Sequence, residues 1–138
     1  MATASELLDQ AVGTFNEAQW EAGEALWADH GVQEEIGTGR TLDRAASTQG
    51  AKDWKAAFPD AQGTIENRIV AGNQAAGEIV WRGTNTGSYM GMPATGKSVQ
   101  MRAVMVITEE DGKIVRMRHY LDVAGMMAQL GTAPGGPG

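Results

Sequence analysis

The segment from Asp111 to Asp122 concentrates residue types that transfer protons or bind polar groups. An Asp-Gly turn signal opens a run of β-prone residues, and the run ends at a carboxylate. Alternation along a strand places Arg118, Tyr120 and Asp122 on one face and His119 on the other. Neither face is uniformly apolar. The segment therefore predicts a strand that borders a cavity or an interface, and we expect functional chemistry there.

Asp122 has a second interpretation that involves no catalysis. It directly precedes a short apolar segment that reads as a helix, and aspartate is a favoured N-cap residue. Arg118 lies on the same predicted face and can pair with this carboxylate. Such a pair would lower the pKa of Asp122 and weaken it as a general base. Which face of the strand turns inward decides between these interpretations.

Composition excludes several classes of function. With 138 residues the chain has the length of one domain, and we expect that domain to span residues 1–131. The net charge is −6 and basic residues do not cluster, so nucleic acid is not an expected partner. The absence of cysteine excludes thiolate catalysis, and two histidines, His30 and His119, are too few for a histidine-rich metal centre. We expect no metal, although carboxylate-ligated sites remain open.

The two ends of the chain indicate where the protein is located in the cell and which segment is mobile. The N-terminus lacks the basic start and long apolar run of a signal peptide, and no apolar stretch approaches the length needed to cross a membrane. We therefore expect a cytoplasmic protein with no membrane contact. Residues 132–138, rich in glycine and proline, are expected to form a mobile tail.

Periodicity and turn signals predict an α+β fold. A capping box at Thr3 opens a first helix, a second helix is expected through Trp20, Gly23 and Trp27, and Asp43 caps a third that ends near Ala57. Helices separated from antiparallel strands favour a curved antiparallel sheet that forms a cone around the N-terminal helices. Strands are expected over 32–36, 64–71, 75–86, 97–108 and 113–122, with a final helix over 123–130.

Such a cone would enclose an apolar pocket, and several residues are candidates for its wall. Trp27 either packs in the core or lines a ligand cavity. Glu34 and Glu35 point to opposite faces of their strand, so one of them can turn inward unless both are solvated. Asn85 and Tyr89 lie near the expected mouth or serve only the loop structure. The many methionines are explained by core packing or by a pocket for a flat ligand.

The chain resembles the SnoaL-like polyketide cyclases of the nuclear-transport-factor-2-like superfamily. The similarity rests on segments 81–87, 89–97, 111–115 and 122–131. It implies a cystatin-like α+β barrel and a cofactor-independent aldol ring closure of a polyketide ester in secondary metabolism. Asp122 matches the family's acid/base aspartate, and an apolar pocket would raise the pKa of its carboxyl. Arg118, Tyr120 and Asn85 are the donors expected to stabilise an enolate.

The resemblance also bears on ligand and assembly. It implies a small apolar, polyketide-derived ligand. The candidate binding residues are Trp27, Trp81, Tyr89, Asn85, Glu34 and His119. It favours the Asp122 face turning inward, which would leave His119 on a face that packs against a second subunit. A homodimer is therefore expected.

Two departures from the family pattern keep other activities open. Asn85 stands where the family often has histidine, and Arg118 stands where it often has tryptophan. The alternatives are a hydroxylase, an epoxide-hydrolase or an isomerase on the same fold, or a ligand-binding or dimerisation module without catalysis.

Overall fold

A computed structural model of the chain describes residues 1–89 and 91–131. The segment expected to form a mobile tail, 132–138, lies outside the described residues, as does Met90. The elements in chain order are α1 (Ala4–Asn16), α2 (Trp20–Glu24), β1 (Trp27–Ile36), β2 (Arg40–Asp43), α3 (Arg44–Ala57), β3 (Gln62–Ala71), β4 (Gln74–Thr84), β5 (Ser98–Glu110), β6 (Lys113–Leu121) and α4 (Val123–Leu130).

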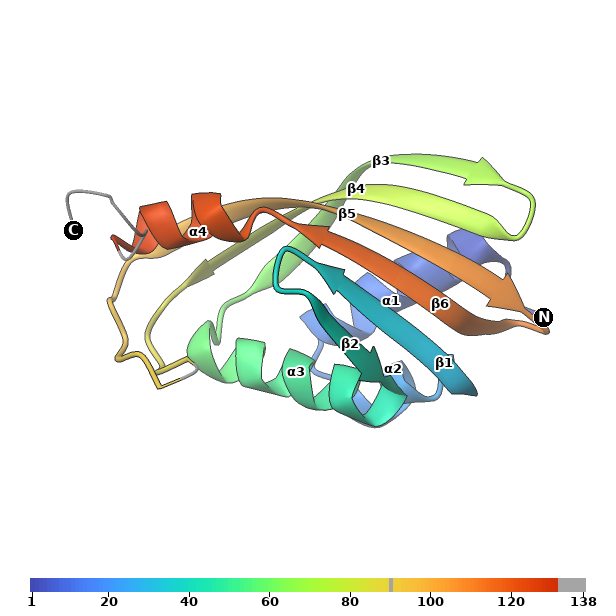
Figure 1. Cartoon of the computed structure of the whole chain (residues 1–138), viewed down its shortest axis with the longest axis horizontal. Helices are drawn as coiled ribbons and strands as arrows, with labels where there is room; N and C mark the ends of the chain where they lie inside the picture. Colours follow the sequence, from blue (N-terminus) through green and yellow to red (C-terminus); the bar gives the residue numbers. More distant parts are fainter. Residues whose placement is uncertain (90, 132–138) are drawn as a thin grey trace.

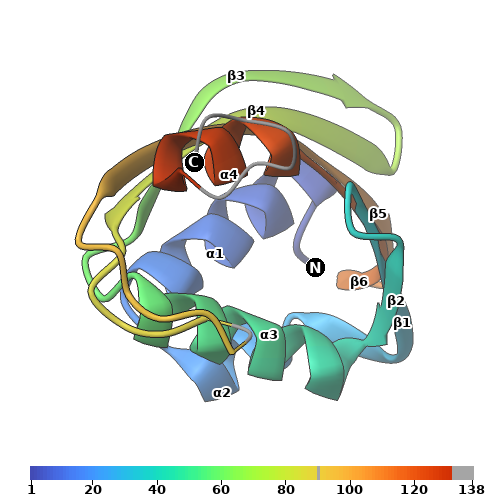
Figure 2. The same cartoon turned by 60° about the vertical axis from the view of Figure 1, so that its left-hand side comes forward.

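Within the described residues, the strands form one curved, open sheet in the order β2-β1-β6-β5-β4-β3. The sheet wraps over α1, α2 and α3, and α4 lies against β5 at one end (Figure 1). An end-on view shows the strands curving around the helices (Figure 2). The predicted α+β architecture with a curved sheet around N-terminal helices is confirmed. The sheet is not wholly antiparallel, however, because β1 and β6 pair in parallel.

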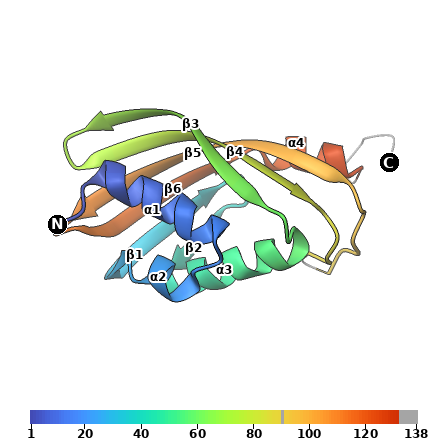
Figure 3. The ribbon, with the colours of Figure 1, turned by 180° about the vertical axis from the view of Figure 1, so that it is seen from behind.

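Helix α1 forms where its capping signals predict. The Thr3 hydroxyl accepts a hydrogen bond from the Glu6 amide, and the Glu6 carboxylate accepts one from the Thr3 amide. Leu7, Leu8 and Val12 recur at helical spacing and are buried against the sheet. Figure 3 shows α1 running beneath β3 and β4. This packing closes one side of the molecule with apolar side chains.

Helix α3 begins at the predicted N-cap, where the Asp43 carboxylate accepts a hydrogen bond from the Ala46 amide at 2.8 Å. It contacts β1 and β2 and ends at Ala57, before the Phe58-Pro59 corner. Most of its side chains are not buried, and small residues line the side that faces the sheet. The helix therefore forms a wall that leaves free space between itself and the sheet.

Two local predictions are wrong. Trp27 starts strand β1 instead of ending the second helix, because α2 stops at Glu24 and Leu26 already accepts a hydrogen bond from the Ile114 amide of β6. The strands expected from the sequence also leave residues 37–43 outside any strand. Residues 40–43 instead form the edge strand β2, and Arg40 pairs with Glu35 across this hairpin.

Candidate functional site

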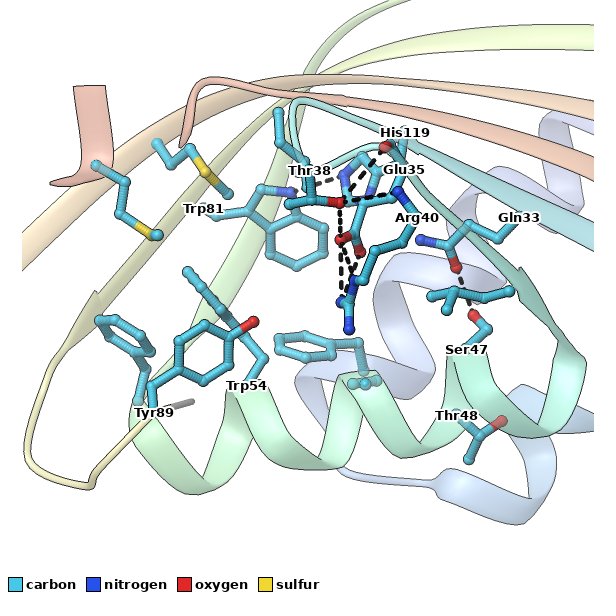
Figure 4. Close-up of a pocket in the computed structure, with 18 of the residues that line it drawn as sticks. Gln33, Glu35, Thr38, Arg40, Ser47, Thr48, Trp54, Trp81, Tyr89 and His119 are labelled. Atoms are coloured by element: carbon cyan, nitrogen blue, oxygen red, sulfur yellow. Dashed lines mark hydrogen bonds and ion pairs between the residues drawn. The ribbon is translucent and has the colours of Figure 1, made fainter. Parts of the chain in front are cut away.

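A cavity of about 620 Å³ lies between the inner face of the sheet and helices α1, α2 and α3. Its wall is mainly aromatic and aliphatic, with methionines contributed by β5, β6 and α4. A small cluster of polar side chains interrupts this apolar wall (Figure 4). An apolar cavity with few polar groups is typical of a site for a small molecule. The members of the polar cluster are Gln33, Glu35, Thr38, Arg40, Ser47 and His119.

Strand register brings the two central ionisable residues together. In the parallel pair β1–β6, Glu35 is the Cα partner of His119 and Gln33 is the partner of Met117. Alternation points these four side chains to the same, inner face. The carboxylate and the imidazole therefore meet in the cavity wall although 84 residues separate them in the chain.

The Glu35 carboxylate is held by a set of donors. Arg40 donates from Nε to Oε1 at 3.0 Å and from Nη2 to Oε2 at 3.3 Å, and the Thr38 hydroxyl donates to Oε1 at 2.6 Å. Burial alone would raise the pKa of Glu35, but these hydrogen bonds outweigh it and lower the pKa below its usual value. Glu35 is therefore a fixed negative charge beside His119.

His119 is neutral in this environment. Burial lowers its pKa to about 4, although the Glu35 charge acts in the opposite direction. The Trp81 indole N–H donates to His119 Nε2 at 3.3 Å, so in the neutral ring the proton belongs on Nδ1. Trp81 reaches this position because its cross-strand partner is Gly63, where a Cβ would lie 2.5 Å from the indole. The site thus presents an uncharged imidazole next to a carboxylate.

Removing Arg40 should destabilise the protein in a pH-dependent way. The Glu35 side chain is 11% exposed and that of Arg40 is 39% exposed, so Arg40→Met leaves a nearly buried carboxylate unpaired. We expect the free energy of unfolding at pH 7 to fall by about 2 kcal/mol, less than for a fully buried pair because Arg40 keeps contact with water.

The sign of the pH dependence follows from the pKa of Glu35. In the wild type that pKa is lowered, so the pair stabilises the fold above about pH 4.5 and this contribution is lost as the pH falls. Urea unfolding should therefore show that Arg40→Met has a lower free energy of unfolding than the wild type at pH 7, and that this difference is smaller at pH 4. Arg102→Met breaks the exposed pair with Glu66 and is the matched control. Equal losses in the two variants would contradict this description.

One end of the cavity is aromatic. Trp54 of α3 stacks on Phe58 with ring centroids 4.4 Å apart, and Tyr89 meets Trp54 edge-on at 5.4 Å. Burial raises the pKa of the Tyr89 phenol, so this hydroxyl stays protonated as a donor. These rings can pack against a flat apolar group.

The face predicted to line the pocket is the outer face. Arg118 lies 3.8 Å from Glu34, and both belong to the side of the sheet away from the cavity. Tyr120 is 42% exposed, and Asp122 is exposed and borders, with Tyr120, a smaller hollow on that outer side. The expectation that this face turns inward is wrong. His119 instead lines the cavity between the sheet and helices α1, α2 and α3, and alternation within β6 cannot reveal which face these helices cover.

Asp122 acts as a helix cap. Its Oδ1 accepts a hydrogen bond from the Gly125 amide at 3.0 Å at the start of α4. Asp122→Ala should therefore lower the free energy of unfolding by about 1 kcal/mol, measured by urea denaturation. Asp122→Asn preserves the cap and should leave it nearly unchanged. An equal loss in both variants would point to a role for the charge itself.

Most of the remaining candidate binding residues lie on the cavity wall. Trp27, Trp81, Tyr89 and His119 all line it. Glu34 does not, because it bonds Arg116 on the outer face.

Asn85 also lines the cavity, but its amide is engaged by the protein. It donates to the carbonyls of Ala57 and Gly87 and accepts from both the amide and the hydroxyl of Thr95. This residue fixes the loop between β4 and β5 and has no donor left for an enolate.

Sequence reasoning missed Arg40, Gln33 and the choice of Glu35 over Glu34. The sequence gives no signal for the choice of Glu35, because Val32 and Ile36 alternate onto the same face of the strand as Glu34. Among the described residues, no group of three or more histidine, aspartate or glutamate side chains is arranged to hold a metal ion. No helix in the described part of the chain is long and apolar enough to cross a membrane.

The sequence of residues 5–130 matches the profile of the SnoaL-like polyketide cyclases. The chain belongs to this family. Comparison with curated protein sequences gives no match.

Solved structures agree with the family assignment. IdmH from Streptomyces antibioticus, described as a candidate polyketide cyclase, is 29% identical with a TM-score of 0.83, over 93% of this chain and 98% of IdmH. AclR from Streptomyces galilaeus, described as a candidate hydroxylase, is 22% identical with a TM-score of 0.85, over 97% of this chain and 84% of AclR.

A protein from Catenulispora acidiphila described as having a ketosteroid isomerase-like fold, solved with trimethylamine, is 18% identical with a TM-score of 0.80, over 96% of each chain. The identities to AclR and to this protein are low, so they establish the fold alone.

Proposed function

We propose that this chain is an enzyme that transfers protons on a small apolar carbonyl compound, with His119 as the acid/base group. The single observation that supports this most strongly is the position of the His119 imidazole in the wall of an apolar cavity, beside the carboxylate of Glu35. Membership of the SnoaL-like polyketide cyclase family supports a reaction of the aldol type. We place the acid/base role on His119 because its ring lines the cavity.

The proposed reaction begins at a carbon between two carbonyl groups. His119 removes a proton from this carbon through Nε2, in place of the long hydrogen bond from Trp81. The C–H electron pair becomes an enolate, and the imidazolium that forms is stabilised by the nearby Glu35 charge. The enolate carbon then attacks a second carbonyl of the same molecule and forms the new C–C bond. The resulting alkoxide takes the proton back from His119, so no oxidant, reductant or cofactor is consumed.

Arg40 and Tyr89 are the groups proposed to stabilise the enolate oxygen. The Arg40 guanidinium is oriented by two hydrogen bonds to Glu35, which leaves its Nη1 without a partner among the described residues. The raised pKa of Tyr89 keeps its hydroxyl a donor. Donors fixed in an apolar cavity stabilise developing charge more strongly than donors in water.

A role for Asp122 is the competing proposal. Its carboxylate would have to act from the outer hollow, which Tyr120 and Arg102 also border. The expected homodimer remains a prediction, and an outer face with Ile36 and Tyr120 exposed is compatible with it.

The experiment uses ethyl benzoylacetate, an aromatic β-ketoester, as a probe in D2O. Proton transfer at the carbon between its carbonyls replaces hydrogen by deuterium, which NMR follows directly. We expect the wild-type protein to accelerate this exchange above buffer, with saturation in the probe. Exchange no faster than in an equal concentration of a protein without such a cavity would reject the proposal.

A further inference from the structure

Gln33 is a buried polar side chain that the proposed chemistry does not use. Its side chain lines the cavity, and the residue is only 7% exposed. Its Oε1 accepts a hydrogen bond of 2.5 Å from the Ser47 hydroxyl. The Gln33 Nε2 group donates to no described residue. Among the described residues, every side-chain nitrogen or oxygen that is fully buried has a hydrogen-bond partner, so the Nε2 group is not fully buried. The amide N–H groups therefore remain open to the cavity.

The Gln33 amide lies at the opposite end of the cavity from the aromatic rings. Figure 4 shows Gln33 and Ser47 on one side of the Glu35–Arg40 pair, and Trp54 and Tyr89 on the other. Helix α3 gives the approximate distance between the two ends of the cavity. Ser47 and Trp54 are seven residues apart on this helix, which is roughly 10 Å at 1.5 Å per residue. The reacting groups lie between these ends.

We propose that Gln33 binds a carbonyl oxygen of the substrate, and that the substrate is elongated, with an aromatic ring at the Trp54–Tyr89 end and this oxygen roughly 10 Å away. This inference rests on the proposed function for the reacting centre between the two ends, and it adds the class of substrate. An unpaired buried donor disfavours a ligand that offers only hydrocarbon at this position, because that ligand leaves the amide unsatisfied. Ser47 positions the amide by fixing its oxygen.

The test compares two ligands of the same length, 7-phenylheptan-2-one and heptylbenzene, which differ in the ketone oxygen. Dissociation constants are measured by quenching of tryptophan fluorescence for the wild type, Gln33→Met and Thr48→Val. Methionine has nearly the shape of glutamine without its donors. Thr48→Val is the matched control, because the Thr48 hydroxyl lines the same end but already donates to the Arg44 carbonyl at 3.0 Å.

We expect Gln33→Met to weaken ketone binding relative to hydrocarbon binding by about tenfold, and Thr48→Val to leave this ratio unchanged. A ratio unchanged in Gln33→Met would overturn the proposal, as would an equal change in both variants. A second measurement does not need a folded variant. In the 15N-labelled wild type, the Gln33 side-chain NH2 signals should shift with the ketone and not with heptylbenzene, and the reverse result would overturn the assignment.

Failure of this inference can be told from failure of the proposed function. Both measurements report binding alone and require no proton transfer. A ketone preference that survives in Gln33→Met, together with deuterium exchange in the wild type, would reject only the role of Gln33. A ketone preference that is lost in Gln33→Met, without deuterium exchange in the wild type, would reject only the proton-transfer function.

Discussion

His119→Gln should slow deuterium exchange in the bound β-ketoester by about 10² to 10⁴, the range that a positioned acid/base group contributes. Glutamine retains an acceptor for the Trp81 N–H, so the cavity wall keeps its hydrogen bond while the titratable nitrogen is lost. The measurement is the exchange rate at saturating probe, followed by NMR. The rate should fall while the dissociation constant of the probe changes little.

Asp122→Asn is the matched variant for this prediction. It removes the carboxylate that the family resemblance favours, yet asparagine caps α4 as well as aspartate does. We expect exchange in Asp122→Asn to stay within a factor of about three of the wild type, well below the loss expected for an acid/base group. The opposite pattern, with Asp122→Asn inactive and His119→Gln active, would return the acid/base role to the outer carboxylate.

Acid should destabilise the wild type through His119. The pKa of this ring is about 4 in the folded protein, against about 6.5 in an unfolded chain. Between these two values the unfolded state binds the proton more readily, so the contribution is complete above about pH 6.5 and is lost as the pH falls towards 4. The difference between the two pKa values corresponds to about 3 kcal/mol of unfolding free energy.

Urea unfolding of wild type and His119→Gln at pH 7 and pH 4.5 checks this prediction. The wild type should lose more unfolding free energy than the variant over this interval. The carboxylates titrate in both proteins and cancel in the comparison. His30→Gln, which removes the exposed histidine, is the control for the loss of a histidine. Parallel pH profiles of wild type and His119→Gln would contradict a buried neutral imidazole.

The elements of this fold follow closely from local sequence signals. The capping box at Thr3 and the N-cap at Asp43 begin their helices as predicted, and the strands β3 to β6 follow the predicted turns. These features depend on neighbouring residues only. Trp27 is the instructive exception, because helical spacing fitted it while long-range pairing between the first and last strands placed it in a strand.

The candidate site could be predicted only as far as its location on β6. Alternation divides Arg118 from His119 but does not say which face is inner. That choice depends on which face the N-terminal helices cover. The parallel pairing of β1 with β6 then places Glu35 beside His119 and Glu34 beside Arg118. A contact over 84 residues leaves no local trace, and the resemblance to the family favoured the other face. The partner of Glu35 was missed for the same reason, since Arg40 sits in an edge strand that reads as a loop.

The most direct test locates the reacting carbon in the cavity. In ethyl 2,2-dimethyl-3-oxo-3-phenylpropanoate, two methyl groups replace the acidic hydrogens of the probe and cannot exchange. Nuclear Overhauser contacts from these methyl groups to the His119 ring protons, and none to the Asp122 side chain, are the predicted result. Contacts to Asp122 or Tyr120 with an unperturbed His119 would contradict the account.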